Sequence, residues 1–395
     1  MKELTASQQK VMDVLQKEII ERYFNPAVDG DEFEILSTIR YDPCFTNVFL
    51  DLPNGEHSTH LCEIDSRLRL LDYDQCEDLF SQEHPTTCEN QGLDSLFDTI
   101  RENSSSFGDY DDSLMSFLNR SEATERSSPP ESSCDHADLY PVFYNRFLLL
   151  GEHYKRLNFS LEFFKWGTHI PMKLLLEKLI EALPEHHEVS SIEEKMPLLL
   201  NESASYKMRV LISKSGRMRV EAHPLVRPPS YCQFPSTSSY FINTILGGFL
   251  PNAPAVWNVF VDTKPMTVSP FTTFKTTYRD HYGAARERLN EMASSYGQSA
   301  QNEILVFNDA YQLMEGSITS VAIIKYKEDD PNKFRFITPP LASGCLCGTM
   351  RYYLLKQGLI DEYPIDVRDL KEGDSVFLFN GVMGCVKGTI RKALK

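Results

Sequence analysis

Apolar positions along the first part of the chain change their spacing several times, and each spacing predicts an element. Alternating apolar and polar residues over 31–43 predict a strand, and alternation on both sides of a Ser-Gly pair over 205–225 predicts a β-hairpin. Between them, residues 138–164 have apolar positions at the spacing of a helix. These pieces together predict a small α/β domain.

A second series of elements begins near Ser239, after a proline-rich stretch that is typical of a linker. The pattern predicts a strand over 255–263, a helix after residue 275, a strand pair over 303–326, a helix over 349–359 and a last strand over 374–381. We therefore expect an α/β (α+β) fold in two domains. The expected parts are an amphipathic helix over 1–30, a small α/β domain over 31–222, a linker over 223–238 and a large domain over 239–395.

The formal charge of −16 is concentrated in one segment of the chain. Residues 51–138 carry 21 acidic and 5 basic residues, 14 serines and no lysine, and the rest of the chain is neutral overall. This composition predicts a largely disordered insertion in the small domain, which is either a docking segment or a tolerated surface loop. A neutral remainder gives no electrostatic footprint for nucleic acid or an anionic membrane surface, so we expect neither as a partner.

Hydropathy and cysteine usage limit the protein class further. No run of about 18 apolar residues exists, and the charged N-terminal stretch is not typical of a signal peptide. The nine cysteines have no repeated spacing, which predicts reduced thiols and no metal site. We expect a cytosolic protein.

Three features of the second half can be interpreted chemically. Gly344 and Gly348 precede a predicted helix whose N-terminus can bind a phosphate, and a second Gly-rich turn over 378–388 can also bind an anion. Glu315 lies between apolar residues and a glycine, and Lys275 stands among Phe, Thr and Tyr just before a helix. Each feature alone is compatible with an ordinary turn, hairpin or surface residue. Together they meet the requirements for holding pyridoxal phosphate (PLP).

Five segments carry a resemblance to a known family: "YKMRVLISKSG", "FTTFKTTYRDHYGAARER", "LMEGSIT", "TPPLASGCLCGTMR" and "LFNGVMGCVKGT". Over residues 31–50 and 139–395 the chain resembles the fold type IV PLP enzymes, which comprise branched-chain and D-amino-acid aminotransferases and aminodeoxychorismate lyases. Within this family it is most similar to the fungal lyases. The resemblance implies a PLP-dependent lyase that converts 4-amino-4-deoxychorismate to 4-aminobenzoate and pyruvate, a step towards folate.

The resemblance also implies roles for individual residues. It makes Lys275 the residue that forms the Schiff base with PLP and then moves the substrate proton, and it places the Glu315 carboxylate opposite the pyridine nitrogen. Arg156 matches the arginine that binds the cofactor phosphate, although by its position alone it would be a solvated helix residue. The backbone of two turns is implied to bind the same phosphate, at Thr349 and Met350 and at Val382 and Met383.

The substrate carries two carboxylates, so a neutral chain must supply local cations for them. Arg209 and Arg40 lie on predicted small-domain strands that face the cofactor in the resembling enzymes, and a guanidinium pairs well with a carboxylate. Either arginine could instead be an ordinary salt-bridged strand residue. The resembling enzymes are mostly homodimers with the active site near the interface, so the resemblance makes a homodimer possible.

The motif after the lysine departs from the aminotransferase pattern. Branched-chain aminotransferases have Asn-Tyr at the fourth and fifth positions after the lysine, whereas this chain has Arg279 and Asp280. The departure favours a lyase over a PLP-dependent aminotransferase of the same fold, which remains an alternative. A non-catalytic interaction protein that uses the acidic insertion is a second alternative.

Overall fold

The computed structural model describes residues 33–46, 139–184, 191–200, 202–226, 237–250, 252–294, 296, 301–327 and 330–394. The helix predicted over 1–30, the acidic insertion over 51–138 and most of the predicted linker lie outside these residues. Of the described residues, 33–35 and 243–394 belong to one compact unit, and 36–46 and 139–242 belong to the other. We call them the lysine unit and the arginine unit, after Lys275 and Arg156.

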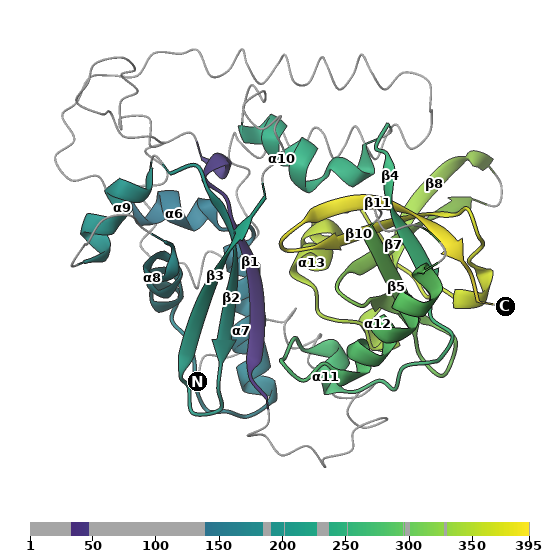
Figure 1. Ribbon diagram of the computed structural model, residues 1–395, viewed down its shortest axis with the longest axis horizontal. Coiled ribbons are helices and arrows are strands. Elements are labelled where there is room, and N and C mark those ends of the chain that lie inside the picture. The colour runs from purple at the N-terminus through teal and green to yellow at the C-terminus, as the bar shows by residue number, and fades with distance from the viewer. Residues whose placement is uncertain are drawn as a thin grey trace. The chain divides into compact units, whose positions relative to one another are not determined.

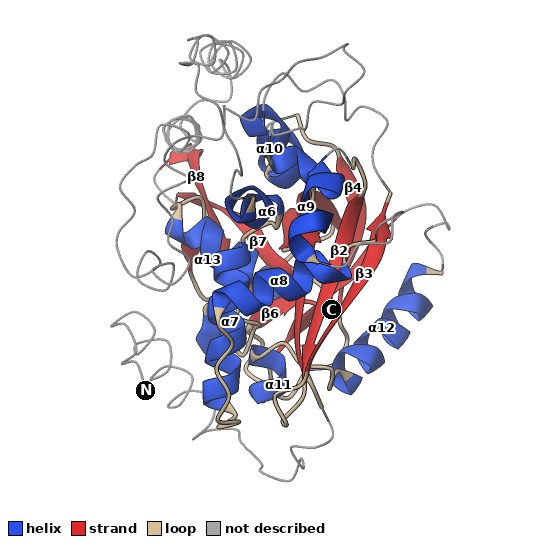
Figure 2. Cartoon of the chain, turned by 90° about the vertical axis from the view of Figure 1, so that its left-hand side faces the viewer, coloured by secondary structure: helices blue, strands red, loops and turns tan. Residues whose placement is uncertain are grey.

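The arginine unit is a three-stranded sheet with helices (Figures 1 and 2). Its elements are β1 (Ile35–Tyr41), α6 (Tyr140–Arg146), α7 (Leu150–Phe163), α8 (Met172–Ala182), α9 (Ile192–Leu200), β2 (Ser205–Ile212), β3 (Met218–Leu225) and the first part of α10 (Thr237–Ile245). The sheet order is β1-β2-β3, and β2 pairs with β3 in an antiparallel register, which confirms the predicted hairpin. Helices α7 and α8 lie along one face of this sheet (Figure 2).

The helix predicted over 138–164 is in fact two helices. Phe147 bridges to Tyr41 of β1, and Leu149 has a left-handed backbone with φ of 52°, so α6 ends before α7 begins. The apolar spacing of α7 places Leu157 and Leu161 in the core, where each is 1% exposed. Local periodicity predicted the helical residues correctly, but a tertiary bridge set the break between them.

The lysine unit contains an eight-stranded mixed sheet in the order β6-β5-β4-β11-β10-β7-β8-β9. Its strands are β4 (Ala255–Val261), β5 (Gln301–Phe307), β6 (Leu313–Gly316), β7 (Ser320–Lys327), β8 (Asp330–Thr338), β9 (Asp361–Glu362), β10 (Ser375–Asn380) and β11 (Gly384–Lys392). Its helices are α11 (Pro270–Thr273), α12 (Asp280–Ala293) and α13 (Thr349–Lys356). These strands and helices confirm the predicted α/β (α+β) class.

Two strand predictions were wrong in this unit. The pair predicted over 303–326 is three strands, β5, β6 and β7, and the strand predicted as the last one, β10, is followed by β11. β11 pairs with β10 and with β4 in the middle of the sheet, although its sequence begins with a glycine and contains a second one. Burial on both sides of a central strand outweighs the low strand propensity of glycine there.

Helix α12 is fixed to the sheet by an ion pair. Arg288 donates from Nε and Nη2 to the two carboxylate oxygens of Asp262, each at 2.6 Å. Asp262 follows β4 and is fully buried, and a bidentate guanidinium–carboxylate pair restricts both distance and orientation. The helix that follows Lys275 is thereby held against β4 and β5.

Among the described residues, no helix has both the length and the apolar character needed to span a membrane.

Candidate active site

Lys275 lies in a short connection whose two ends are both fixed. Before it, Ser269 caps α11 in a capping box with Thr272, and the helix ends at Thr273 with Phe274 as its C-cap. After it, Thr276 forms an antiparallel bridge with Ile35. Phe274 and Thr276 are each 1% exposed, whereas Lys275 is half-buried. The backbone therefore holds this lysine between two buried neighbours, as a reactive side chain requires.

Glu315 is a buried carboxylate on β6, with 3% of its surface exposed. Tyr282 of α12 donates its hydroxyl to Glu315 Oε1, and the backbone N–H of Leu346 donates to the same carboxylate. Burial raises the pKa of Glu315 to about 7, against the opposing effects of Tyr282, Arg279 and Leu346. This carboxyl group therefore changes its charge near neutral pH.

The turn that precedes α13 provides a helix N-terminus next to these residues. Gly348 is the N-cap, it provides no side-chain cap, and Thr349 and Met350 are the first two residues of the helix. The N–H of Cys347 donates to the carbonyl of Thr273 at 2.9 Å, which joins this turn to the end of α11. An uncapped N-terminus of this kind favours an anion.

Gly348 is needed for a close approach. A Cβ atom added there would lie 2.7 Å from Ser320 Oγ on β7, which is closer than any real contact. The turn before α13 therefore lies directly against the start of β7.

The second predicted phosphate turn connects β10 to β11. The backbone N–H groups of Val382 and Met383 both donate to Asn380 Oδ1, each at 2.9 Å. Asn380 also donates from Nδ2 to the carbonyl of Ile318 at 3.1 Å. These N–H groups point toward a side-chain oxygen, and Asn380 ties the turn to the connection between β6 and β7.

The connection between β6 and β7, residues 316–319, is held in place by Glu303. This fully buried carboxylate of β5 accepts hydrogen bonds from the Ser317 N–H at 3.0 Å, Ser317 Oγ at 2.6 Å, the Ile318 N–H at 3.2 Å and Thr319 Oγ1 at 2.9 Å. Gly316 admits this carboxylate, because a Cβ atom there would lie 2.8 Å from Glu303 Cδ. Glu303 thus fixes the segment that directly follows Glu315.

Replacing Glu303 with glutamine is expected to destabilise the protein by about 3 kcal/mol. The substitution keeps the shape but turns an amide donor towards groups that are themselves donors, and buried unsatisfied donors are costly. Urea unfolding measures the loss, and Glu287→Gln, an exposed position on α12, is the control with an expected change near zero. Equal stability of the two variants would contradict this role of Glu303.

The segment 315–320 therefore contacts the start of the helix after Lys275 and both predicted phosphate turns. It reaches the chain after Lys275 through Tyr282, and also through Arg279, whose Nη2 donates to the carbonyl of Ser317 at 2.8 Å. It reaches the turn before α13 through Leu346 and Gly348, and the 381–383 turn through Asn380. Residues from five separate stretches of sequence form one connected site.

Arg156 lies in the arginine unit, on α7, and is buried with 8% of its surface exposed. Its Nη2 donates to Ser37 Oγ at 2.9 Å and lies 3.4 Å from His153 Nδ1, while Ser37 Oγ lies 2.8 Å from the same nitrogen. A solvated helix residue, which is what its position alone predicts, would not be buried. Arg156 is instead oriented by two buried polar side chains.

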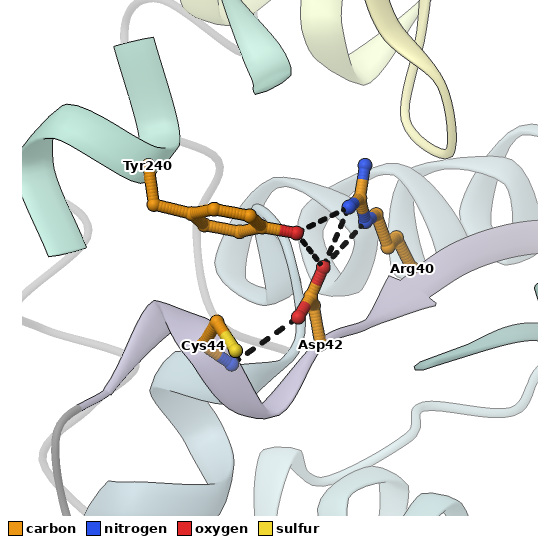
Figure 3. Close-up of polar contacts among 4 residues, drawn as sticks. All are labelled: Arg40, Asp42, Cys44 and Tyr240. Carbon is orange, nitrogen blue, oxygen red and sulfur yellow. Dashed lines mark hydrogen bonds and ion pairs between the residues drawn. The ribbon is translucent and has the colours of Figure 1, made fainter. Parts of the chain in front are cut away.

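Arg40 belongs to a buried polar cluster in the arginine unit (Figure 3). Its Nη2 donates to Asp42 Oδ2 at 2.6 Å and to the Tyr240 hydroxyl at 2.8 Å, and that hydroxyl donates to Asp42 Oδ2 at 2.6 Å. Burial, and then the charge of Asp42, raise the pKa of Tyr240. Figure 3 shows the third guanidinium nitrogen pointing away from Asp42 and Tyr240. Arg40 therefore has a fixed orientation with one nitrogen outside the cluster.

Arg209 lies on β2 and donates from Nη1 to Glu221 Oε2 on β3 at 2.8 Å. Arg219 contacts the other oxygen of Glu221 at the same distance, so this carboxylate is shared. The side chain of Arg209 is 34% exposed. It is a salt-bridged strand residue that also remains partly accessible.

Sequence reasoning did not identify Tyr282, Glu303 or Asn380. Glu303 gave one usable signal, since it is a charged residue at the start of the apolar run "EILVF". Tyr282 and Asn380 gave none, because each looks like an ordinary helix or strand-end residue. No group of three or more His, Cys, Asp or Glu residues that could hold a metal ion is present in the described part of the chain.

The chain matches a protein-family model and is similar in sequence to a known enzyme. Residues 137–389 match the model of a family described as amino-transferase class IV. The chain is 39% identical over 376 residues to aminodeoxychorismate lyase of Saccharomyces cerevisiae, covering 92% of this chain and 94% of that protein.

Two solved structures are more distant. The 4-amino-4-deoxychorismate lyase of Pseudomonas aeruginosa is 15% identical with a TM-score of 0.39, covering 62% of this chain and 78% of that one. The branched-chain amino acid aminotransferase of Escherichia coli is also 15% identical with a TM-score of 0.39, covering 61% and 70%.

Proposed function

The chain belongs to the class IV aminotransferase family, and from this membership we propose that it is an aminodeoxychorismate lyase. The reaction converts 4-amino-4-deoxychorismate to 4-aminobenzoate and pyruvate. The observation that carries the proposal is the 39% identity to the yeast lyase over nearly the full length of both chains. The buried carboxylate of Glu315 and its contact with the turn before α13, in the same unit as Lys275, support the proposal.

The residues present fit PLP as the cofactor. Glu315 offers a buried carboxylate to a pyridine nitrogen, and the uncapped N-terminus of α13 offers N–H groups to a phosphate. Thr273 Oγ1, two residues before Lys275, is buried and has no hydrogen-bond partner among the described residues. A buried orphan hydroxyl is costly unless a bound group satisfies it, so its position favours a ligand there. When bound, PLP supplies an electron-withdrawing ring that accepts the electrons of a broken C–H bond.

Lys275 is proposed to bind the cofactor and to transfer the proton. Its amine takes the proton from the ring carbon that carries the substrate amine, and the bond to the enolpyruvyl oxygen then breaks with its electron pair leaving on oxygen. Protonation of the enolpyruvyl methylene, which we also assign to Lys275, yields pyruvate. The remaining six-membered ring becomes aromatic, which makes the step favourable.

The other predicted residues are proposed to bind and orient. Glu315 keeps the pyridine nitrogen protonated, because an adjacent carboxylate stabilises a cation. Arg156 is proposed to bind the phosphate, and its contacts with Ser37 and His153 would hold the guanidinium in place. The backbone at Thr349, Met350, Val382 and Met383 is assigned to the same phosphate, although in the structure the N–H groups of the last two bind Asn380.

Arg40 and Arg209 are proposed to bind the substrate carboxylates. The third nitrogen of Arg40 in Figure 3 and the partial exposure of Arg209 are compatible with this assignment. Each would then share its charge between an existing carboxylate partner and the substrate. A cytosolic location remains a prediction from the sequence, and a homodimer remains a possibility that the family resemblance implies.

A product assay tests the proposed reaction. We expect purified protein with added PLP and 4-amino-4-deoxychorismate to form 4-aminobenzoate and pyruvate in equal amounts, measured by chromatography and by a coupled reduction of pyruvate. D-alanine and leucine, each with a keto acid, are control substrates and should give no amino transfer. Amino transfer without 4-aminobenzoate would make the protein an aminotransferase. The absence of both products would favour a non-catalytic protein.

A further inference from the structure

Tyr282 forms a contact that the motif after Lys275 did not predict. It is the third residue of α12, seven positions after the lysine, and it is 3% exposed. Its hydroxyl donates to Glu315 Oε1 across 33 positions of sequence. Tyrosine hydroxyls that are buried usually have one partner, and here that partner is the proposed ligand of the pyridine nitrogen.

Arg279 holds the Tyr282 ring in place. Its Cζ lies 4.3 Å from the centroid of that ring, within the range of a cation–π contact. Its Nη2 donates to the carbonyl of Ser317, whose N–H and hydroxyl are bound by Glu303. The guanidinium is therefore fixed at one end by the 316–319 connection and covers the tyrosine at the other.

The surroundings of Glu315 have opposing effects on its ionisation. Burial favours the neutral acid, and the neighbouring carboxylate of Glu303 acts in the same direction. The Tyr282 hydroxyl, the Arg279 cation and the Leu346 N–H favour the carboxylate. The buried thiol of Cys345 also interacts electrostatically with this group, and its pKa is raised to about 11, mainly by burial. The ionised form of Glu315 thus depends on a small number of donors.

We propose that Tyr282 and Arg279 are positioning residues that orient Glu315 and keep it ionised opposite a cationic ring nitrogen. This positioning role rests on the proposed function, in which Glu315 binds the pyridine nitrogen of the cofactor. Both residues act through Glu315 and not on the reacting atoms. Arg279 stands at the fourth position after the lysine, where branched-chain aminotransferases have Asn, and it contacts the tyrosine three residues later.

The first test is the titration of Glu315 in the cofactor-free protein. Infrared difference spectra against Glu315→Gln report the protonated carboxyl group of Glu315 between pH 5 and 9. Tyr282→Phe keeps the ring but removes the donor, and we expect the midpoint to rise by about one pH unit, a tenfold change in the protonation equilibrium. Tyr311→Phe is the control, because Tyr311 is four positions before Glu315 and is 43% exposed.

A matched pair of arginine variants tests the second residue. Arg279→Met removes the cation over Tyr282, and we expect the midpoint to rise. Arg286→Met removes another cation of the same helix, whose Nη1 donates to Ser317 Oγ at 3.1 Å. Arg286 is not among the largest contributors to the pKa of Glu315, whereas Arg279 is. We expect no change in this variant. If Tyr282→Phe does not fold, this pair still decides the question.

A measurement of PLP affinity tests whether the ionisation of Glu315 affects cofactor binding. At pH 7.5 we expect Tyr282→Phe to bind PLP about threefold more weakly than the wild type, by equilibrium dialysis, because a rise of the midpoint from about 7 to about 8 leaves only about a quarter of Glu315 ionised, and a neutral Glu315 cannot stabilise a cation. Unchanged midpoints in Tyr282→Phe and Arg279→Met would overturn the proposal, as would shifted midpoints with unchanged PLP affinity. Failure of the lyase reaction would be a separate result, since neither measurement uses the substrate.

Discussion

Replacing Lys275 with alanine is expected to reduce the formation of 4-aminobenzoate by about ten-thousandfold or more. The substitution removes both the amine that is proposed to bind PLP and the group that moves the proton, and each contribution is large. We also expect the visible absorption of bound PLP to disappear. The fold should remain, because Phe274 and Thr276 on either side keep their buried positions.

Lys264→Ala is the matched control for this prediction. Lys264 is an exposed lysine eleven residues earlier in the same unit, and it contacts Asp262 through its backbone N–H rather than its side chain. We expect full activity and an unchanged PLP spectrum. Product formation by Lys275→Ala at more than about one hundredth of the wild-type rate would reject the assigned role, since general acid–base catalysis alone is worth that much.

Replacing Glu315 with glutamine is expected to lower the lyase rate by about a hundredfold or more and to remove a pH dependence of stability. The ionised carboxylate stabilises the protonated pyridine nitrogen, and a neutral amide does not. The carboxyl group of the unfolded chain loses its proton near pH 4.5, whereas the pKa in the folded protein is about 7. The folded state therefore holds this proton longer than the unfolded state does.

The sign of the stability effect follows from that difference. Below about pH 4.5 both states are protonated and Glu315 has no effect, whereas from pH 5 to pH 8 folding becomes less favourable, by about 3 kcal/mol in total. Urea unfolding of the PLP-free protein at a series of pH values measures this slope. Glu315→Gln should lack it and be the more stable protein at pH 8, and PLP should reduce the slope in the wild type because a cation then pairs with the carboxylate.

Asp309→Asn is the control for the pH series. Asp309 is exposed in the turn between β5 and β6, six positions before Glu315, so its removal should leave the slope unchanged. If the wild type and Glu315→Gln lose stability equally between pH 5 and 8, burial of this carboxyl group does not have the consequence that we infer.

Several elements could be predicted from the sequence because they depend on neighbours in the chain. Alternation on both sides of Ser-Gly defined the hairpin of β2 and β3, and the motifs around Lys275 and Glu315 were enough to indicate the family. The same reasoning failed for β11, whose glycines argue against a strand, and for the break between α6 and α7, which depends on the bridge from Phe147 to Tyr41.

The sequence by itself determined the α/β class and most of the elements, and it indicated Lys275 and Glu315 as candidate site residues, since periodicity and motif spacing are local properties. Only the tertiary structure decided what surrounds them. Tyr282 meets Glu315 across 33 positions, Arg156 meets Ser37 across 119, and Glu303 accepts bonds from a connection 14 to 16 positions away. Such contacts arise when separate strands and helices pack together, and the charge of a buried group depends on all of its neighbours in space.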